Sequence, residues 1–145
     1  MSARPTLHLL KIAQGIESPV ALRRAQQRRL RSDAKGQGRL AHFTRNRPVR
    51  AAELLAGGSI YWVIRGHISV RQRLLDIVDA TNARGTQGVE LVFHPELVTT
   101  EPRRHRAFQG WRYLDANLAP PDRATVIDPG LPDSLARDLY RLGLL

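Results

Sequence analysis

Two stretches in which apolar and polar positions alternate, residues 60–65 and 68–78, stand out along the chain. A period of two is the period of a β-strand, so both stretches predict strands. Gly66 lies between them, and a glycine there either closes a tight turn or marks a bulge. The pattern predicts two neighbouring strands, or one long strand bent at Gly66. Trp62 shares its face with two isoleucines and is predicted to be a core residue.

Shorter stretches of the same character predict further strands. Residues 6–12 predict a first, mostly buried strand, and residues 40–45 predict a second. Residues 89–93 predict another strand, which residues 97–99 extend or restart. Residues 79–88 are rich in turn formers and predict a hairpin tip. The residues available there for positive φ are Asn82, Gly85 and Gly88.

Helix signals flank these strands. Ser18 and Pro19 suit the N-cap and first position of a helix, which is predicted to continue to the next glycines. A shorter helix is predicted over residues 49–56, ended by the glycine pair that follows. A last helix is predicted over residues 135–142.

The remaining segments are predicted to lie at the surface or at the edge of the core. Residues 101–106 predict an exposed polar segment, and residues 117–128 a surface segment without regular structure. The aromatic residues within 107–114 are predicted to close one end of the core.

These elements predict an α+β fold in a single domain covering residues 1–145. We expect a small mixed, mostly antiparallel sheet, curved or closed, of about five or six strands and flanked by three helices. The alternative is an open sheet with helices packed on one face. A chain of this length can bury a sizeable core without disulfides or a structural metal.

The composition limits the compartment and the chemistry. The chain contains no cysteine, which excludes disulfides, thiolate metal sites and cysteine nucleophiles. The N-terminal residues lack the apolar core of a signal peptide, and no stretch reaches the ~20 apolar residues of a membrane span. We therefore expect a soluble, cytoplasmic protein without a membrane partner.

The net charge of +10 is concentrated in the first part of the chain. Residues 1–50 contain 12 basic and 2 acidic residues, whereas residues 51–145 contain 11 of each. Such an asymmetry predicts a surface that faces a polyanion. The alternative is a solvated surface whose arginines reflect GC-rich codon usage, because only two of the basic residues are lysines.

Four of these basic residues form a stripe along the predicted first helix. Their spacings of four, three and four place them on one side of the helix. Like charges so spaced repel one another unless an anion, a carboxylate or water compensates. The stripe predicts phosphate contacts or the solvated outer face of an amphipathic helix. Its members are Arg24, Arg28, Arg31 and Lys35.

Catalytic motifs are weak. Residues 57–61 lack the last glycine of a serine-hydrolase elbow, and neither the GxxxxGK[ST] nor the GxGxxG phosphate loop occurs. The five histidines have no metal-ligand spacing, so we predict no metal and no cofactor. Acid–base chemistry remains open to His42 or His67 beside a carboxylate. The candidate carboxylates are Glu53, Asp76, Glu90 and Asp122.

A more informative constellation combines arginines with aromatic rings. Arginine binds phosphate through paired hydrogen bonds, and aromatic rings offer stacking faces to bases. We predict a cleft for a base or nucleotide, lined by Tyr61, Arg65, Trp111 and Tyr113. The full set predicted to bind nucleic acid is Arg24, Arg28, Arg31, Lys35, Arg45, Arg47, Arg50, Tyr61, Arg65, Arg104, Arg106, Trp111, Arg112 and Tyr113.

The strings HFTRNRPVRAAELLAGGSIYWVIRGHISVRQRLLDI and RRHRAFQGWRYLDANLAPPD resemble the bacterial family of unknown function DUF1489, which is similar over nearly the whole chain. No established activity or catalytic set comes with that family. The segment 47–55, the glycine turn and the two strands after it also resemble the PUA-like barrels of the ASCH and EVE types. That resemblance implies a β-barrel that recognises RNA or modified bases in a cleft. Here Gly58-Ser59 replaces the usual Gly-Asp of those folds.

We therefore predict nucleic acid, with RNA favoured, as the partner, and leave the oligomeric state open. One alternative is a small hydrolase or nucleotide-processing enzyme with His42 or His67 and a carboxylate in the same cleft. Another is an adaptor whose basic helix meets an acidic protein. An enzyme should place the histidine and the carboxylate within hydrogen-bond reach, and an adaptor should present a flat apolar patch.

Overall fold

The computed structural model describes residues 5–31 and 39–123. In the described residues, strands alternate with two helices as far as the third strand, and further strands and a 3₁₀ turn follow. The elements are β1 (Leu7–Ile12), α1 (Pro19–Arg31), β2 (Leu40–Thr44), α2 (Ala51–Leu55), β3 (Ser59–Ile64), β4 (His67–Thr81), β5 (Gln87–Phe93), β6 (Val98–Arg104), β7 (Trp111–Asp115) and the 3₁₀ turn η1 (Ala116–Leu118).

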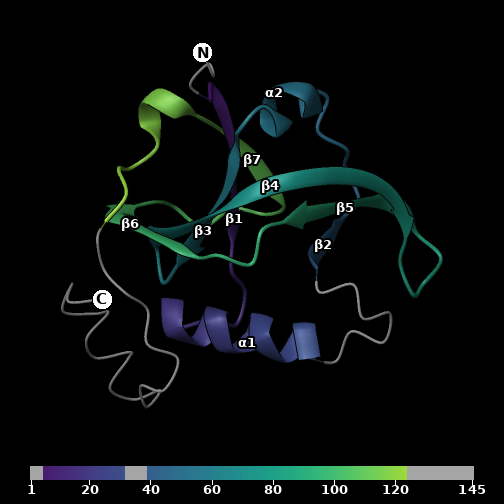
Figure 1. Cartoon of the computed structure of the whole chain (residues 1–145), viewed down its shortest axis with the longest axis horizontal. Helices are drawn as coiled ribbons and strands as arrows, with labels where there is room; N and C mark the ends of the chain where they lie inside the picture. Colours follow the sequence, from purple (N-terminus) through teal and green to yellow (C-terminus); the bar gives the residue numbers. More distant parts are fainter. Residues whose placement is uncertain (1–4, 32–38, 124–145) are drawn as a thin grey trace.

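All seven described strands belong to one curved sheet, in which six follow the order β2-β5-β4-β3-β1-β7 and β6 pairs with β4 off this path. The only parallel pair among them is β1 with β3, and the other pairs are antiparallel. The long strand β4 organises the sheet, since its first part pairs with β3 and β6 and its last part with β5 (Figure 1). The predicted α+β class with a mixed, mostly antiparallel curved sheet is confirmed.

The sheet is not closed, so it is the curved sheet and not the predicted barrel that forms. Strands β2 and β7 lie at opposite ends of the strand order and do not pair with each other. In Figure 1 the two described α-helices lie at opposite ends of the sheet, α1 below and α2 above, and both contribute to the same large core cluster. Only two of the three predicted helices are therefore found. The third, at 135–142, lies outside the described residues.

Gly66 closes a tight turn between two separate strands, which decides between the two alternatives for this segment. Ile64 pairs with His67, so Arg65 and Gly66 alone form the β3–β4 turn. Both have positive φ, 50° and 80°, as a type I′ turn requires. Asparagine and glycine are the usual residues there, and a left-handed backbone costs another L-residue about 1–2 kcal/mol. Arg65 therefore occupies a strained position.

The core lies on both faces of the central strands. Every residue of β3 is buried. Trp62 faces a large cluster shared with β1, β4 and β5, and its indole packs edge-on against Phe93. Tyr61 points to the other face, into a smaller cluster with Leu10 and Leu114. The prediction that Trp62 is a core residue is confirmed.

Local signals locate the helices and turns well. The Ser18 hydroxyl accepts a hydrogen bond from the Ala21 amide, as an N-cap does. After α2, Gly57 has φ 97°, and a side chain at Gly58 would collide with the carbonyl oxygens of two other residues. The β4–β5 hairpin tip was also predicted, and of its candidates for positive φ only Gly85 has it.

One strand was predicted only at its start, since residues 97–99 were expected to extend or restart a strand, and another was not predicted. Residues 101–106 were assigned to an exposed polar segment, but β6 runs through Arg104 and pairs with β4. Residues 111–115 were assigned to the end of the core, but they form β7 and pair with β1. Among the described strands β7 pairs only with β1, and the other side of β6 has a single bridge, from Thr100 to Asp122. A strand near the edge of a sheet does not need the apolar pattern of a central one. The predicted surface segment from residue 117 begins within a 3₁₀ turn.

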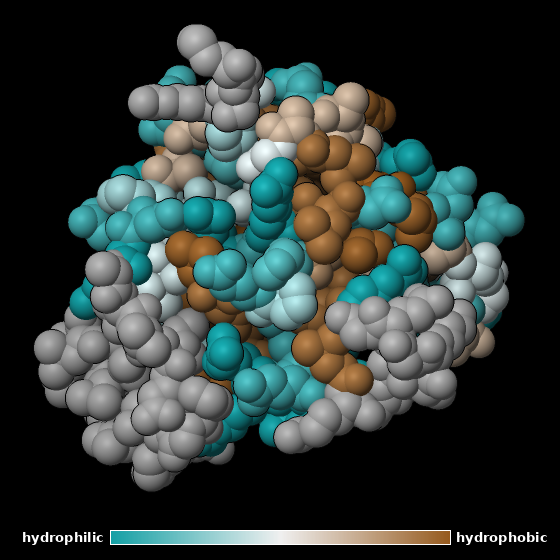
Figure 2. Space-filling view, viewed as in Figure 1, coloured by the Kyte–Doolittle hydropathy of each residue, from teal (hydrophilic) through white to brown (hydrophobic). Residues whose placement is uncertain are grey.

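The surface view shows how polar and apolar residues are distributed. Polar residues cover the outer side of α1, and a band of apolar residues runs over the sheet next to it (Figure 2). The large apolar residues with exposed side chains come from three separate elements. They are Val49, Leu75 and Leu118.

Candidate functional site

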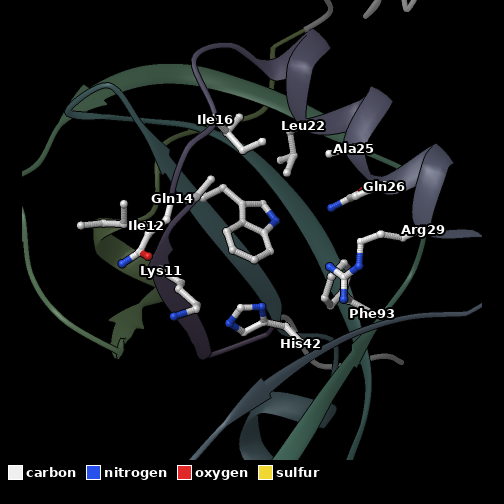
Figure 3. Close-up of a pocket in the computed structure, with 12 residues that line it drawn as sticks. Lys11, Ile12, Gln14, Ile16, Leu22, Ala25, Gln26, Arg29, His42 and Phe93 are labelled. Carbon is white, nitrogen blue, oxygen red and sulfur yellow. The ribbon is translucent and has the colours of Figure 1, made fainter. Parts of the chain in front are cut away.

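A pocket of about 340 Å³ lies between α1 and the sheet (Figure 3), and we call it the α1 pocket. Strands β1 and β2 form one side of it and α1 the other. Apolar side chains line most of the pocket, and nitrogen-bearing side chains of β1, α1, β2, β3 and the loop after β1 also line it. The residues that supply polar or aromatic groups are Lys11, Gln14, Gln26, Arg29, His42, Trp62 and Phe93.

Strand periodicity explains why a lysine enters this pocket. Leu7, Leu9 and Lys11 are two residues apart along β1, so their side chains share the core face. The two leucines are buried in the large cluster, whereas Lys11 comes at the end of the strand, where the cluster opens. The pocket therefore continues the hydrophobic core toward α1.

The aromatic wall of the pocket is held by a buried amide network. The Trp62 indole N–H donates to Gln72 Oε1 at 2.9 Å. Gln72 and Gln26 exchange two amide hydrogen bonds of 2.8 and 2.7 Å, and Gln72 also donates to the His94 carbonyl at 3.1 Å. The network connects α1 to β3, β4 and the end of β5. It fixes the orientation of the indole that lines the pocket.

The pocket is electropositive. No described residue forms a hydrogen bond or ion pair with the Lys11 ammonium, and burial lowers its pKa. Arg29 donates to the Ala41 carbonyl at 2.6 Å, which holds the guanidinium beside the pocket. Burial, followed by the charges of Lys11 and Arg29, lowers the pKa of His42 to about 4, so this imidazole is neutral at pH 7. No aspartate or glutamate is among the described residues that line the pocket. The pocket therefore suits a flat ring that carries an anionic group.

A second electropositive hollow, of about 710 Å³, lies at the β3–β4 turn, and we call it the turn hollow. The His105 amide donates to the Gly66 carbonyl at 2.8 Å, which joins the end of β6 to the turn. Arg104 is paired with His67 across the two strands. No acidic residue is among the described residues that line the hollow. The lining side chains are Arg65, His67, Arg104, His105 and Arg106.

Next to the turn hollow, the guanidinium of another arginine lies over an aromatic ring. The Phe108 ring lies edge-on to His105 at 5.1 Å, and the Arg112 guanidinium lies 5.5 Å from the Phe108 centroid. The structure thus brings together four residues of the predicted nucleic-acid-binding set. They are Arg65, Arg104, Arg106 and Arg112.

The predicted cleft lined by Tyr61, Arg65, Trp111 and Tyr113 does not form. Tyr61 is only 4% exposed and faces the smaller core cluster. Trp111 and Tyr113 pack against the large cluster on the opposite face, and Arg65 is at the β3–β4 turn. The register across β1 separates the rings: Tyr61 pairs with Leu10 and Tyr113 with Leu9, and neighbouring residues of a strand point to opposite faces.

Trp111 and Tyr113 instead form a small site with the loop before α2. Their rings are 5.0 Å apart, the Trp111 indole donates to the Asn46 carbonyl, and the Arg50 amide donates to the Tyr113 hydroxyl. The Arg50 guanidinium is bound by both oxygens of Glu53, at 2.9 and 2.6 Å. This ion pair neutralises one arginine of the predicted set.

The other predicted arginines are spread over the surface. Arg47 forms an ion pair with Asp79 at 2.7 Å, and Arg45 is exposed. Arg28 is exposed on α1, and helical spacing places it and Arg24 on the side of α1 away from the pocket residues. Arg31 ends α1. Lys35 lies outside the described residues.

A third hollow, of about 530 Å³, contains a buried histidine of β1. His8 Nδ1 accepts the Ser59 amide hydrogen at 2.9 Å, and its ring lies edge-on to Tyr61 at 4.9 Å. Arg71 is bound by both oxygens of Asp122 and donates to the Ser59 hydroxyl. The carboxylate near this histidine is thus occupied by an arginine.

The predicted histidine and carboxylate pair of an enzyme is not assembled. His42 packs edge-on against Trp62, and His67 Nδ1 lies 3.3 Å from the Arg65 carbonyl. Neither histidine hydrogen-bonds to a carboxylate among the described residues. Over the same residues, no group of three or more histidines and carboxylates is arranged to hold a metal ion.

His8 is expected to make stability depend on pH. Burial and the Arg71 charge lower the pKa of His8 to about 4, from 6.5 when unfolded. Between these values the unfolded chain binds a proton that the folded chain does not, so stability falls as the pH is lowered. From about pH 8 to about pH 5 we expect His8 to contribute a loss of about 2 kcal/mol in the free energy of unfolding. Urea unfolding over this range measures it.

The variant His8→Asn keeps an acceptor for the Ser59 amide but cannot bind the proton. It should therefore flatten the pH profile. His94→Asn is the matched control, because Nδ1 of the exposed His94 also accepts a backbone amide, that of Glu96. A His8→Asn profile as steep as that of the parent chain would refute the assignment.

Sequence reasoning did not assign a binding role to Lys11, Gln26, Arg29 or Trp62. One signal was present, since Lys11 continues the buried face of an otherwise apolar strand. A charged residue at such a position requires solvent, a partner or a ligand. The indole of Trp62 gave no signal, because a residue that belongs to the core can also line a pocket.

Comparison with known proteins places the chain in a family but identifies no characterised relative. Residues 9–145 match the family described as "Protein of unknown function (DUF1489)". No curated protein and no solved structure matches the chain. The described part of the chain contains no helix that is long and apolar enough to span a membrane.

Proposed function

This chain belongs to the DUF1489 family, and we propose that it binds nucleic acid, RNA in particular, and holds one unpaired nucleotide in the α1 pocket. The observation that carries the proposal is the composition of that pocket. Lys11 and Arg29 supply positive charge, Trp62 and Phe93 supply aromatic surface, and no described carboxylate faces a ligand there. A nucleotide combines the two matching properties, a flat ring and a phosphate.

The size and shape of the pocket support an unpaired nucleotide. A volume of about 340 Å³ lies at the lower end of the range for ligand pockets, about 300–1,000 Å³, which fits one nucleotide. A base in a duplex cannot enter such a pocket without leaving its stack, whereas single-stranded RNA offers its bases freely. Arg29 and Lys11 would contact the phosphate.

Binding to single-stranded RNA is expected in the range of about 1–100 μM at low salt, and to be weakened by salt. The logarithm of the binding constant should fall linearly with the logarithm of the salt concentration, with a slope of about −0.7 for each phosphate contacted. Fluorescence anisotropy with labelled RNA of several base compositions measures both quantities.

The duplex of the same sequence is the control. It presents the same phosphates but no unpaired base, so it should bind more weakly than the single strand at equal salt. Absence of RNA binding at the lowest salt, or binding that does not respond to salt, would refute the proposal.

A further inference from the structure

We infer that the turn hollow is a second site, which binds phosphate groups of a nucleic-acid backbone. The hollow lies at the β3–β4 turn and is lined by side chains that the α1 pocket does not share. The inference rests on the proposed function in one respect only, that the bound phosphate belongs to a nucleic acid. Two independent observations support it, the strained backbone of Arg65 and the charge of the lining residues.

The strain at Arg65 indicates that its side chain is needed. Position 65 has φ 50° in a two-residue turn, where asparagine would form the same turn with less strain. Arg65 is exposed, and among the described residues no acidic partner holds it. Packing and ion pairing therefore do not explain an arginine at this position. Backbone strain of this kind clusters at binding sites, where the surrounding structure holds the residue in the strained conformation that its function requires.

The lining residues come from two paired strands and the turn that precedes one of them. Strand pairing places Arg104 directly opposite His67, and the hydrogen bond from His105 to Gly66 holds the end of β6 against the turn. Arg65 and Arg106 complete the rim. Three guanidinium groups close together repel one another, and an anion with two oxygens relieves that repulsion through paired hydrogen bonds. A phosphodiester group has this form.

The hollow differs from the α1 pocket in what it can recognise. Among its described lining residues the only rings are the imidazoles of His67 and His105, and the Arg112 guanidinium already lies over the Phe108 ring beside it. Its guanidinium groups can therefore contact the backbone, whereas no phenyl, phenol or indole ring lines it to hold a base. We expect it to raise affinity for every sequence alike and to add to the salt dependence.

The test is the variant Arg65→Asn, which creates the Asn-Gly pair preferred in a type I′ turn. We expect the urea midpoint of unfolding to rise, because the strain is relieved. The affinity for single-stranded RNA should fall by about 3- to 10-fold, as for one lost charge-assisted contact. The salt slope should become shallower by about 0.7.

Arg84→Asn is the matched control. Arg84 is also an exposed arginine before a positive-φ glycine in a hairpin turn, but its own φ is not positive and it does not line the hollow. Arg84→Asn removes the same charge as Arg65→Asn, but outside the hollow, where salt screens its effect on a bound phosphate. The affinity of this variant should therefore stay within about 2-fold of that of the parent chain. Arg104→Gln, on β6, should reproduce the loss of affinity without the gain in stability.

A base-free probe separates this inference from the proposed function. An abasic oligomer of sugar and phosphate should bind the parent chain weakly and lose that binding in Arg65→Asn. If RNA binds and Arg65→Asn changes neither the affinity nor the salt slope, the turn hollow is not a phosphate site, although the proposed function stands. If neither RNA nor the abasic oligomer binds, both proposals fail.

Discussion

Replacement of Gln72 by alanine is expected to lower the free energy of unfolding by about 3–5 kcal/mol. Gln72 is fully buried and hydrogen-bonds to Gln26, Trp62 and the His94 carbonyl. Alanine would leave a cavity and deprive the indole N–H and the Gln26 amide of their partners. A buried polar group without a partner loses its hydration without compensation, so the effect exceeds that of the cavity alone. Urea unfolding measures the loss.

Two further variants test the reason for this loss. Gln87→Ala removes an exposed glutamine from β5 and should change the free energy of unfolding by less than about 0.5 kcal/mol. The double variant Gln26→Leu with Gln72→Leu removes both amides of the reciprocal pair. It should lose less than the sum of the two single leucine variants, by about 1–2 kcal/mol, since neither amide is left without the other. A Gln72→Ala loss below about 1 kcal/mol would contradict the network's structural role.

Replacement of Lys11 by methionine is expected to weaken binding of single-stranded RNA by about 10-fold or more. Methionine keeps the aliphatic length of the side chain but removes the ammonium that points into the α1 pocket (Figure 3). The variant should be at least as stable as the parent chain. Burial already disfavours the charged form of Lys11, as its lowered pKa indicates. Anisotropy and urea unfolding on the same samples measure the two effects.

Arg84→Met removes an equal charge from the β4–β5 turn and serves as the control for Lys11→Met. Its affinity for RNA should change little, since the residue lines neither electropositive hollow. Equal losses in the two variants would mean that net charge alone governs binding, and the α1 pocket would then have no specific role. A loss confined to Lys11→Met would support the pocket.

Local patterns predicted the parts of the fold that depend on neighbours in sequence. The alternation through β3 and β4 predicted both strands because their side chains face two buried clusters. The cap at Ser18 and the positive-φ glycines predicted helix ends and turns because these rules concern one residue and its immediate backbone. Strand β7 and all but the start of β6 escaped prediction because their stability comes from pairing with β1 and β4, and their own sequences are too polar or too short to indicate it.

The candidate sites were predicted by residue type but not by location. The excess of arginine and the presence of aromatic rings were readable from composition, and three of the predicted residues line the turn hollow, with Arg112 beside it. The predicted cleft failed because Tyr61 and Tyr113 lie on opposite faces of the sheet. The α1 pocket was not predicted, since Lys11 and Arg29 are brought together by the packing of α1 against the sheet.

The sequence by itself determined the element types, the α+β class and the supply of cationic and aromatic groups, because periodicity, capping and composition are properties of the chain before it folds. The tertiary structure alone decided which cations share a hollow and which are neutralised. Arg50 and Arg47 find carboxylates, whereas Lys11 faces a pocket without one. The physical reason is that electrostatic and aromatic contacts act over a few ångströms between residues far apart in sequence, and only the packing of helix on sheet sets those distances.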